Sequence, residues 1–178
     1  MLFFKTYYHK IVKYDLVNTF LCQNLTEIPE LKKIVLNFGY QKSNLKYLIS
    51  GLLALEFITS KKGSLTKSKH LNLFLKIKKG NPVGCKIVLK KNTMYFFYIR
   101  LITSMFSKAK QSPKYQFQWS SKSVKSISIQ LKSPLLFSDL ETQFQFFRNI
   151  QRLDITLVTN SGSQKELFFF LKSLKFFI

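Results

Sequence analysis

The chain has 178 residues, 46% of them apolar, and its formal net charge is +21. The apolar share is typical of a folded protein and too high for a disordered basic tail, and the length fits one domain with a real core. The excess positive charge indicates a polyanionic partner, because unbalanced like charge destabilises a compact chain.

The first third of the chain is predicted to alternate helices and strands. Apolar residues at helical spacing indicate a helix over about 6–21, and a turn is expected at 26–29. Alternating apolar and polar residues predict a strand over 31–39, and helical spacing predicts a second helix over about 45–57. The expected apolar stripe of that second helix consists of Leu45, Leu48, Ile49, Leu52 and Leu53.

The middle of the chain contains strong turn signals. Residues 58–72 are lysine-rich and are expected to form a short strand, a turn and an exposed loop, and Gly80-Asn81-Pro82 is a turn signal. Alternation predicts a strand over 83–90, after which Asn92 can cap a helix. The apolar stripe of that helix consists of Met94, Phe97, Tyr98, Leu101, Ile102 and Met105.

The last third adds two strands, over 127–131 and 153–158, and a short helix near 140–149. Ser163 and Glu166 form a capping box for a final helix that ends near Leu174. Irregular interleaving of helices with half-buried strands favours a single α+β domain with an antiparallel sheet over a doubly wound parallel sheet.

A long segment lacks carboxylates. Between Glu56 and Asp139 lie 82 residues without Asp or Glu, and they include 17 lysines and arginines. The cations around the predicted loop are Lys61, Lys62, Lys67, Lys69, Lys76, Lys78 and Lys79, and Lys86, Lys90 and Lys91 continue the patch. Because no acidic residues neutralise these cations, we interpret the segment as a phosphate-binding surface rather than as a lysine face that only contacts water.

Aromatic residues offer a second possible contact with RNA. Tyr115, Phe117 and Trp119 could stack on bases, but their alternation with polar residues favours a half-buried strand. His70 lies in the basic loop, where RNA contact and simple exposure both remain open.

Catalytic and metal-binding groups are sparse, so neither an enzyme nor a cofactor is predicted. Asp139 and Glu141 are better explained as acidic residues in the first turn of a helix than as ligands of a metal ion. His9 has no other candidate ligand near it in the sequence. Cys22 and Cys85 match no zinc spacing, and we expect two buried thiols in a reducing compartment, with a disulfide as the alternative. The longest weakly charged stretch, 47–55, is too short to span a bilayer.

Eight segments carry a family resemblance: the Tyr7-Tyr8 helix, Ile28-Pro29, 32–39, Thr66-Lys67, 80–87, Met94, 100–102 and 152–159. Together they resemble the bacterial-type L-five family of large-subunit ribosomal proteins, which holds 5S rRNA in the central protuberance. The resemblance implies an antiparallel sheet with helices on one face, an RNA-facing surface opposite and a mobile basic loop at about 67–80.

The resemblance also implies contacts. The resemblance assigns six residues to rRNA: Asn37, Gly39, Thr66, Lys67, Gly84 and Lys86. The lysine patch adds Lys61 and Lys90 to this set. The residues assigned to the elbow of the P-site tRNA are Lys69, His70, Lys76, Lys78 and Lys79. Further expected partners are other large-subunit rRNA, neighbouring proteins of the central protuberance and a small-subunit head protein across an intersubunit bridge.

The chain departs from the family pattern in three places. Tyr40-Gln41 replaces a second glycine, 68–71 alters a basic-serine run, and 111–130 lacks the usual arginine- and glycine-rich pattern of the bridge region. The chain has 19 phenylalanines, and lysine greatly outnumbers arginine. This bias indicates an AT-rich genome. Together with the family resemblance and the lack of an arginine-rich transit peptide, it leads us to expect a mitochondrially encoded protein, with a low-GC bacterium as the alternative source.

A rival function is docking on an anionic membrane surface, without insertion. Such docking favours an amphipathic helix with lysines opposite its apolar stripe. The helix over 94–105 carries only Arg100 as a formal charge, so it is predicted to be a core helix.

Overall fold

A computed structural model of the chain describes residues 2–21, 24, 26–40, 45–109, 117–148 and 150–176. The described residues form a six-stranded sheet of order β2-β3-β1-β6-β5-β4, and every neighbouring pair is antiparallel. The strands are β1 (Leu31–Gly39), β2 (Ser64–Lys67), β3 (Pro82–Leu89), β4 (Phe117–Ser123), β5 (Ser126–Leu131) and β6 (Leu153–Thr159).

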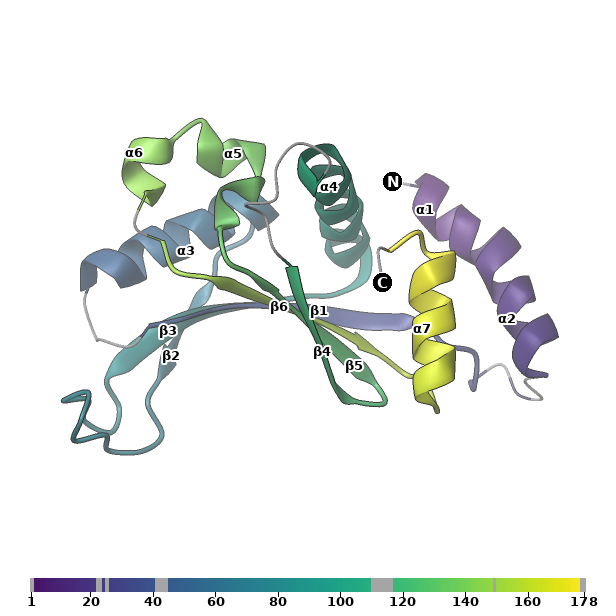
Figure 1. The fold of residues 1–178 in the computed structure, drawn as a ribbon, viewed down its shortest axis with the longest axis horizontal. Helices are drawn as coiled ribbons and strands as arrows, with labels where there is room; N and C mark the ends of the chain where they lie inside the picture. Colours follow the sequence, from purple (N-terminus) through teal and green to yellow (C-terminus); the bar gives the residue numbers. More distant parts are fainter. Residues whose placement is uncertain are drawn as a thin grey trace.

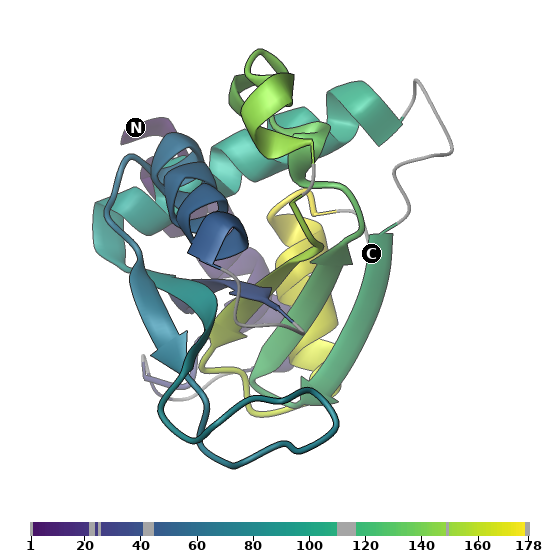
Figure 2. The ribbon, with the colours of Figure 1, turned by 90° about the vertical axis from the view of Figure 1, so that its left-hand side faces the viewer.

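Helices cover one face of this sheet. The helical segments are α1 (Leu2–Tyr7), the π-helical turn η1 (Tyr8–Val12), α2 (Lys13–Phe20), α3 (Leu45–Thr59), α4 (Lys91–Ala109), η2 (Pro134–Leu136), α5 (Ser138–Glu141), α6 (Phe144–Phe147) and α7 (Gln164–Ser173). Helices α3 to α6 lie above the sheet, and α7 stands beside the N-terminal helices at the right-hand end (Figure 1). The loop between β2 and β3 extends away from α3 and α4 (Figure 2).

Burial alternates along the central strands. Ile34, Leu36 and Phe38 of β1 are fully buried, whereas Val35 and Asn37 between them are only half-buried. The same alternation in β5 and β6 means that one face of the sheet packs on the helices and the other is open. The predicted α+β architecture is confirmed, and so are the bounds of the strand over 31–39.

The apolar stripe of α4 was predicted well and that of α3 was not. Met94, Phe97, Tyr98 and Leu101 of α4 are buried and Ile102 is half-buried, while the side chain of Met105 lies outside the part that the structure describes. In α3 the predicted Leu45, Ile49 and Leu53 are 70%, 57% and 44% exposed. The buried side of α3 consists of Leu48, Gly51, Ala54, Leu55, Ile58 and Thr59. Because α3 is apolar almost all round, its composition does not select a face; the small Gly51 and Ala54 admit close packing on the inner side.

Several predicted boundaries were wrong. The first helix begins at Leu2, residues 58–59 belong to α3, and α5 and α6 replace one helix over 140–149. Asn92 lies inside α4, which begins at Lys91, so Asn92 is not the cap. Instead, the side chain of Thr93 forms a hydrogen bond at the start of α4: its Oγ1 donates to the carbonyl oxygen of Lys90 at 2.9 Å.

The predicted capping box was confirmed, and so was one of the two predicted buried thiols. Ser163 Oγ accepts a hydrogen bond from the Glu166 N–H at 3.2 Å, as a capping box requires. The Glu166 carboxylate in turn accepts from the Gly162 N–H at 2.8 Å. Cys85 is a buried free thiol, whereas Cys22 lies outside the described residues.

The turn after α2 is held by a residue from the far end of the chain. Asn160 Oδ1 accepts from the Glu30 N–H at 2.6 Å, and its Nδ2 donates to the carbonyl oxygens of Thr26 and Ile28 at 3.2 Å. Among the described residues, no helix is long and apolar enough to cross a bilayer.

Candidate nucleic-acid interface

Strands β1, β2 and β3 carry six aligned residues on the open face of the sheet. In one row, Ser64 pairs with Lys86, and Lys86 pairs with Asn37. In the next row, Thr66 pairs with Gly84, and Gly84 pairs with Gly39. Directly paired residues project to the same face, so these six residues form one surface, here called the sheet patch. Five of its members, all except Ser64, are among the residues assigned to rRNA.

Close packing within the sheet patch requires a glycine at position 84. A Cβ there would lie 2.5 Å from the carbonyl oxygen of Phe38 and 2.7 Å from Thr66 Oγ1. At Gly39 the nearest atom to an added Cβ is Asn37 Nδ2 at 3.9 Å. The surface above Gly39 is therefore open, whereas Gly84 fills its site.

Buried side chains hold the inner side of the same strands. Cys85 Sγ donates to the carbonyl oxygen of Leu48 in α3 at 3.3 Å, and burial raises the pKa of this thiol to about 11. Tyr40 extends β1 by donating its N–H to the Val83 carbonyl oxygen at 2.9 Å. Its hydroxyl, whose pKa burial also raises, lies against Gly51. Contacts with α3 thus anchor the strands beneath the sheet patch.

The row that contains Asn37 continues across β6 and β5. Asn37 pairs with Asp154, and Asp154 pairs with Gln130. Arg152 Nε lies 4.0 Å from Asp154 Oδ1. The carboxylate makes this part of the face less favourable for phosphate, so the cationic region lies on the β2–β3 side. Neither Asp154 nor Gln130 was predicted to have a role, although each alternates with apolar residues along its strand, as open-face residues do.

The loop over 68–81, here called the basic loop, is hydrogen-bonded at its base. Ser68 N–H donates to the Asn81 carbonyl oxygen at 2.8 Å, and Gly80 N–H donates to the Ser68 carbonyl oxygen at 3.0 Å. Gly80 has φ +89°, a conformation that glycine adopts without steric cost. All residues assigned to tRNA are exposed here: Lys69, His70, Lys76, Lys78 and Lys79.

The remaining assigned lysines flank the sheet patch. Lys67 ends β2 at the base of the basic loop, beside a register shift. Lys61 precedes β2 and Lys90 follows β3, so both lie at the end of this hairpin away from the loop, and both are exposed. The structure therefore brings five assigned residues into one patch and arranges the other assigned lysines and His70 around it and along the loop.

The other candidates from the sequence play other parts. Asp139 and Glu141 are in the first turn of α5, as predicted, and Asp139 forms an ion pair with Arg100. His9 is exposed on the N-terminal helix. Strand β4 confirms the strand expected around 117–119, while Tyr115 lies outside the described residues. Within the described ranges, no three potential metal-ligating side chains gather.

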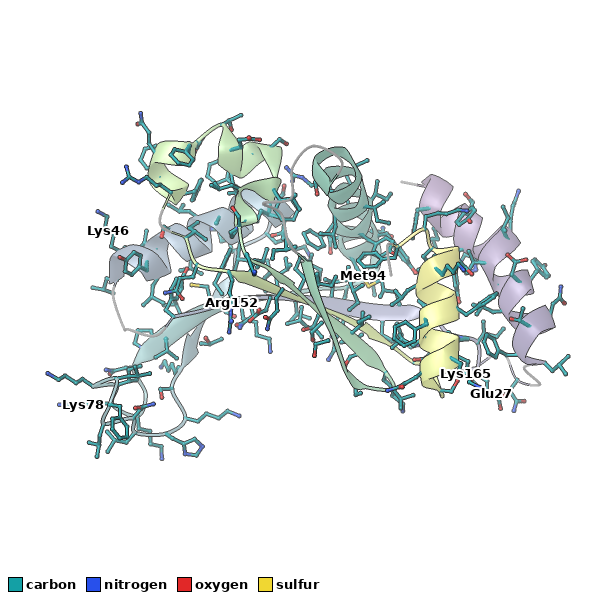
Figure 3. The ribbon with its side chains drawn as sticks, in the orientation of Figure 1. Glu27, Lys46, Lys78, Met94, Arg152 and Lys165 are labelled. Atoms are coloured by element: carbon teal, nitrogen blue, oxygen red, sulfur yellow. The ribbon has the colours of Figure 1, made fainter. Side chains whose placement is uncertain are left out.

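Charge is distributed unevenly over the molecule. Glu27 and Lys165 lie at the end of the sheet opposite Lys78 of the basic loop (Figure 3). Asn160, which directly follows β6, donates a hydrogen bond to Thr26 in the turn that contains Glu27. Nearby, the Glu166 carboxylate accepts from the Gly162 N–H at the start of α7. The end that carries the basic loop is thus far from Glu27 and Glu166.

Named relatives match nearly the whole chain. It is 31% identical over 164 residues to the "Large ribosomal subunit protein uL5m" of Reclinomonas americana, covering 91% of this chain and 90% of that protein. It is 33% identical over 176 residues to the uL5c protein of Mesostigma viride, covering 96% and 92%. It is 33% identical over 167 residues to a uL5 protein of Clostridium botulinum, covering 89% and 88%.

No family model matches the chain. The relatives nevertheless match 89–97% of the chain, and they are ribosomal proteins from mitochondria, chloroplasts and bacteria. The chain therefore belongs to the uL5 family of large ribosomal subunit proteins, with a structural role rather than a catalytic one.

Proposed function

We propose that this chain binds 5S rRNA, or adjacent large-subunit rRNA, in the central protuberance through the sheet patch. One observation carries the proposal: Asn37, Gly39, Thr66, Gly84 and Lys86 align across three strands on the uncovered face of the sheet. Lys86 can pair with phosphate, while the Asn37 amide and the Thr66 hydroxyl can bond phosphate or ribose oxygens. The open space above Gly39 lets an RNA backbone come close.

The basic loop is proposed to contact the elbow of P-site tRNA during translation. Its four lysines and His70 are exposed on a hairpin that extends beyond the rest of the sheet (Figure 2). Neighbouring central-protuberance proteins and a small-subunit head protein across a bridge complete the proposed set of partners. Lysine-rich composition and the mitochondrial relative favour a mitochondrial ribosome over a bacterial one.

Docking on an anionic membrane is the weaker candidate. The α4 helix buries Phe97, Tyr98 and Leu101 in the core, so it cannot lay that apolar stripe on a lipid surface without unfolding the domain.

The test is RNA affinity measured over a series of salt concentrations with three variants of equal charge change. Lys86→Gln and Lys78→Gln should each weaken binding to 5S rRNA and lower the magnitude of the log–log salt slope by about 0.7–0.9, the value for one neutralised phosphate. Lys165→Gln, an exposed lysine at the opposite end of the molecule, is the matched control and should change neither quantity.

Equal losses in all three variants would mean that only net charge matters and would contradict the proposed surface. An unchanged affinity in Lys86→Gln, with its unfolding midpoint preserved, would remove the sheet patch from the interface. Sequencing the RNA that co-purifies with the tagged chain identifies which rRNA occupies the patch.

A further inference from the structure

The tip of the basic loop presents four large apolar side chains to water. Leu71 is 60% exposed, Leu73 77%, Phe74 100% and Leu75 41%. Only Ile77 in this stretch is buried, at 5% exposure. A contiguous apolar patch on a protein surface usually marks a place that a partner covers.

Hydrogen bonds fix the shape of this tip. Asn72 and Ile77 pair through their backbones, with N–H···O distances of 2.9 and 3.0 Å. Inside this bridge, Lys76 N–H donates to the Leu73 carbonyl oxygen at 3.1 Å, and Asn72 Oδ1 accepts from the Leu75 N–H at 3.1 Å. The tight turn over 73–76 therefore places Phe74 at its apex in the free chain.

The charges around the tip restrict the partner. Lys69, Lys76, Lys78 and Lys79 are all exposed within the same loop, and the nearest carboxylates in sequence are Glu56 and Asp139. A partner must therefore offer negative charge and an apolar face together. RNA offers both, because each phosphate adjoins a base with a flat π face.

Whether an RNA can stack a base on the Phe74 ring depends on whether that base is paired. In an A-form duplex the base faces are stacked inside, and side chains cannot enter the deep major groove. In loops, bulges and ends the bases can be splayed out and stack on aromatic rings. The tip also belongs to the hairpin that carries the sheet patch, so both surfaces can contact one assembly.

We propose that Phe74 stacks on an unpaired nucleobase and that the flanking leucines widen this apolar contact while the loop lysines bind the adjacent phosphates. The proposal rests on the RNA-binding function above and deepens it: the basic loop selects RNA with exposed bases rather than any polyanion. Phe74 is thus a specificity-determining residue, and the lysines supply sequence-independent attraction.

An anionic lipid surface is the competing occupant, because it too combines negative charge with an apolar interior. Substituting leucine separates the two. Leucine and phenylalanine gain similar free energy on transfer out of water, so Phe74→Leu should preserve lipid insertion. Leucine has no π face, so the same variant should lose a base stack.

The experiment uses the full chain with two RNA probes: a hairpin that carries 2-aminopurine in an unpaired loop, and the same stem closed into an uninterrupted duplex. The wild-type chain should bind the hairpin more tightly and quench the 2-aminopurine. Phe74→Ala should lose about 5- to 150-fold in hairpin affinity, the range for one base–aromatic stack. Phe74→Leu should lose most of the same factor, Phe74→Trp should retain affinity and quenching, and duplex binding should not change.

Phe146→Leu is the matched control, since Phe146 is 74% exposed on α6 and lies outside the loop. It should leave both affinities unchanged. Equal hairpin affinity in Phe74→Leu and wild type, or equal losses on hairpin and duplex, would overturn the proposal. Binding to phosphatidylglycerol vesicles that Phe74→Ala abolishes and Phe74→Leu keeps, without an effect on RNA, would overturn it in favour of lipid. None of these outcomes depends on Lys86, whose variant tests the proposed function separately.

Discussion

Gly39 and Gly84 face each other across β1 and β3, but the fold needs only one of them. Gly84 is enclosed by the Phe38 carbonyl oxygen and Thr66 Oγ1, whereas Gly39 faces open space. A side chain at position 84 would push strands apart, while one at position 39 would project from the open face. The pair therefore separates a requirement of folding, at Gly84, from the binding role that we propose for Gly39.

We expect Gly84→Ala to lower the free energy of unfolding by about 1–3 kcal/mol, because the added methyl overpacks a close strand contact. Gly39→Ala should leave stability unchanged or raise it by about 0.5 kcal/mol, because alanine loses less entropy in a strand, and it should weaken rRNA binding. Urea unfolding and RNA titration of both variants measure the two effects. A destabilised Gly39→Ala, or one with undiminished RNA affinity, would contradict this division.

At the scale of elements, Arg100 joins three helices over the sheet. From α4, its Nη1 donates to the Ile58 carbonyl oxygen at 2.8 Å and to the Phe57 carbonyl oxygen at 3.4 Å, near the C-terminus of α3. Its Nη2 forms an ion pair with Asp139 of α5. Burial lowers the pKa of Arg100, but a guanidinium stays charged, so it complements the negative end of the α3 dipole.

Removing this guanidinium should loosen the helical layer. Arg100→Met should lower the free energy of unfolding by about 1–3 kcal/mol, because Asp139 and the two carbonyl groups lose a charged donor. Arg148→Met is the matched control, since Arg148 is exposed on the end of α6, and surface substitutions usually change stability by less than about 0.5 kcal/mol. Equal unfolding midpoints for the two variants would mean that Arg100 adds little to the layer.

For the whole molecule, the charge of +21 is a cost to the free chain and an advantage to the complex. Like charges repel each other in the isolated domain, and bound RNA phosphates would remove that repulsion. The lysines that we propose to drive association are therefore expected to keep the free protein below its best stability.

Salt should act in opposite directions on folding and on RNA binding. Raising ionic strength from about 0.01 to 0.15 M shortens the Debye length from about 30 to 8 Å, so the unfolding temperature of the isolated chain should rise. If screening is the cause, the unfolding temperatures in sodium chloride and in potassium chloride should be the same at equal ionic strength. A flat or falling unfolding temperature would show that self-repulsion does not limit this domain.

Parts of the architecture could be predicted because their signals are local. Strand β1 was predicted correctly because the large apolar residues Ile34, Leu36 and Phe38 stand at every second position, and the α4 stripe followed from helical spacing. The face of α3 could not be predicted, because a helix with apolar residues on all sides is oriented only by what packs against it, here Tyr40 and Cys85. Five residues of the sheet patch, all except Ser64, came from the family resemblance; only the register of β1, β2 and β3 shows that they are neighbours.

The sequence by itself determined the charge, the alternation of the strands and the lysine-rich loop, since each depends on composition or on residues close together in the chain. The tertiary structure decided which residues meet over long separations. Asn160 reaches the turn at Thr26, and Asp139 meets Arg100. It also decided that Phe74 stands exposed at the apex of a hydrogen-bonded turn, because exposure depends on what the rest of the chain leaves uncovered.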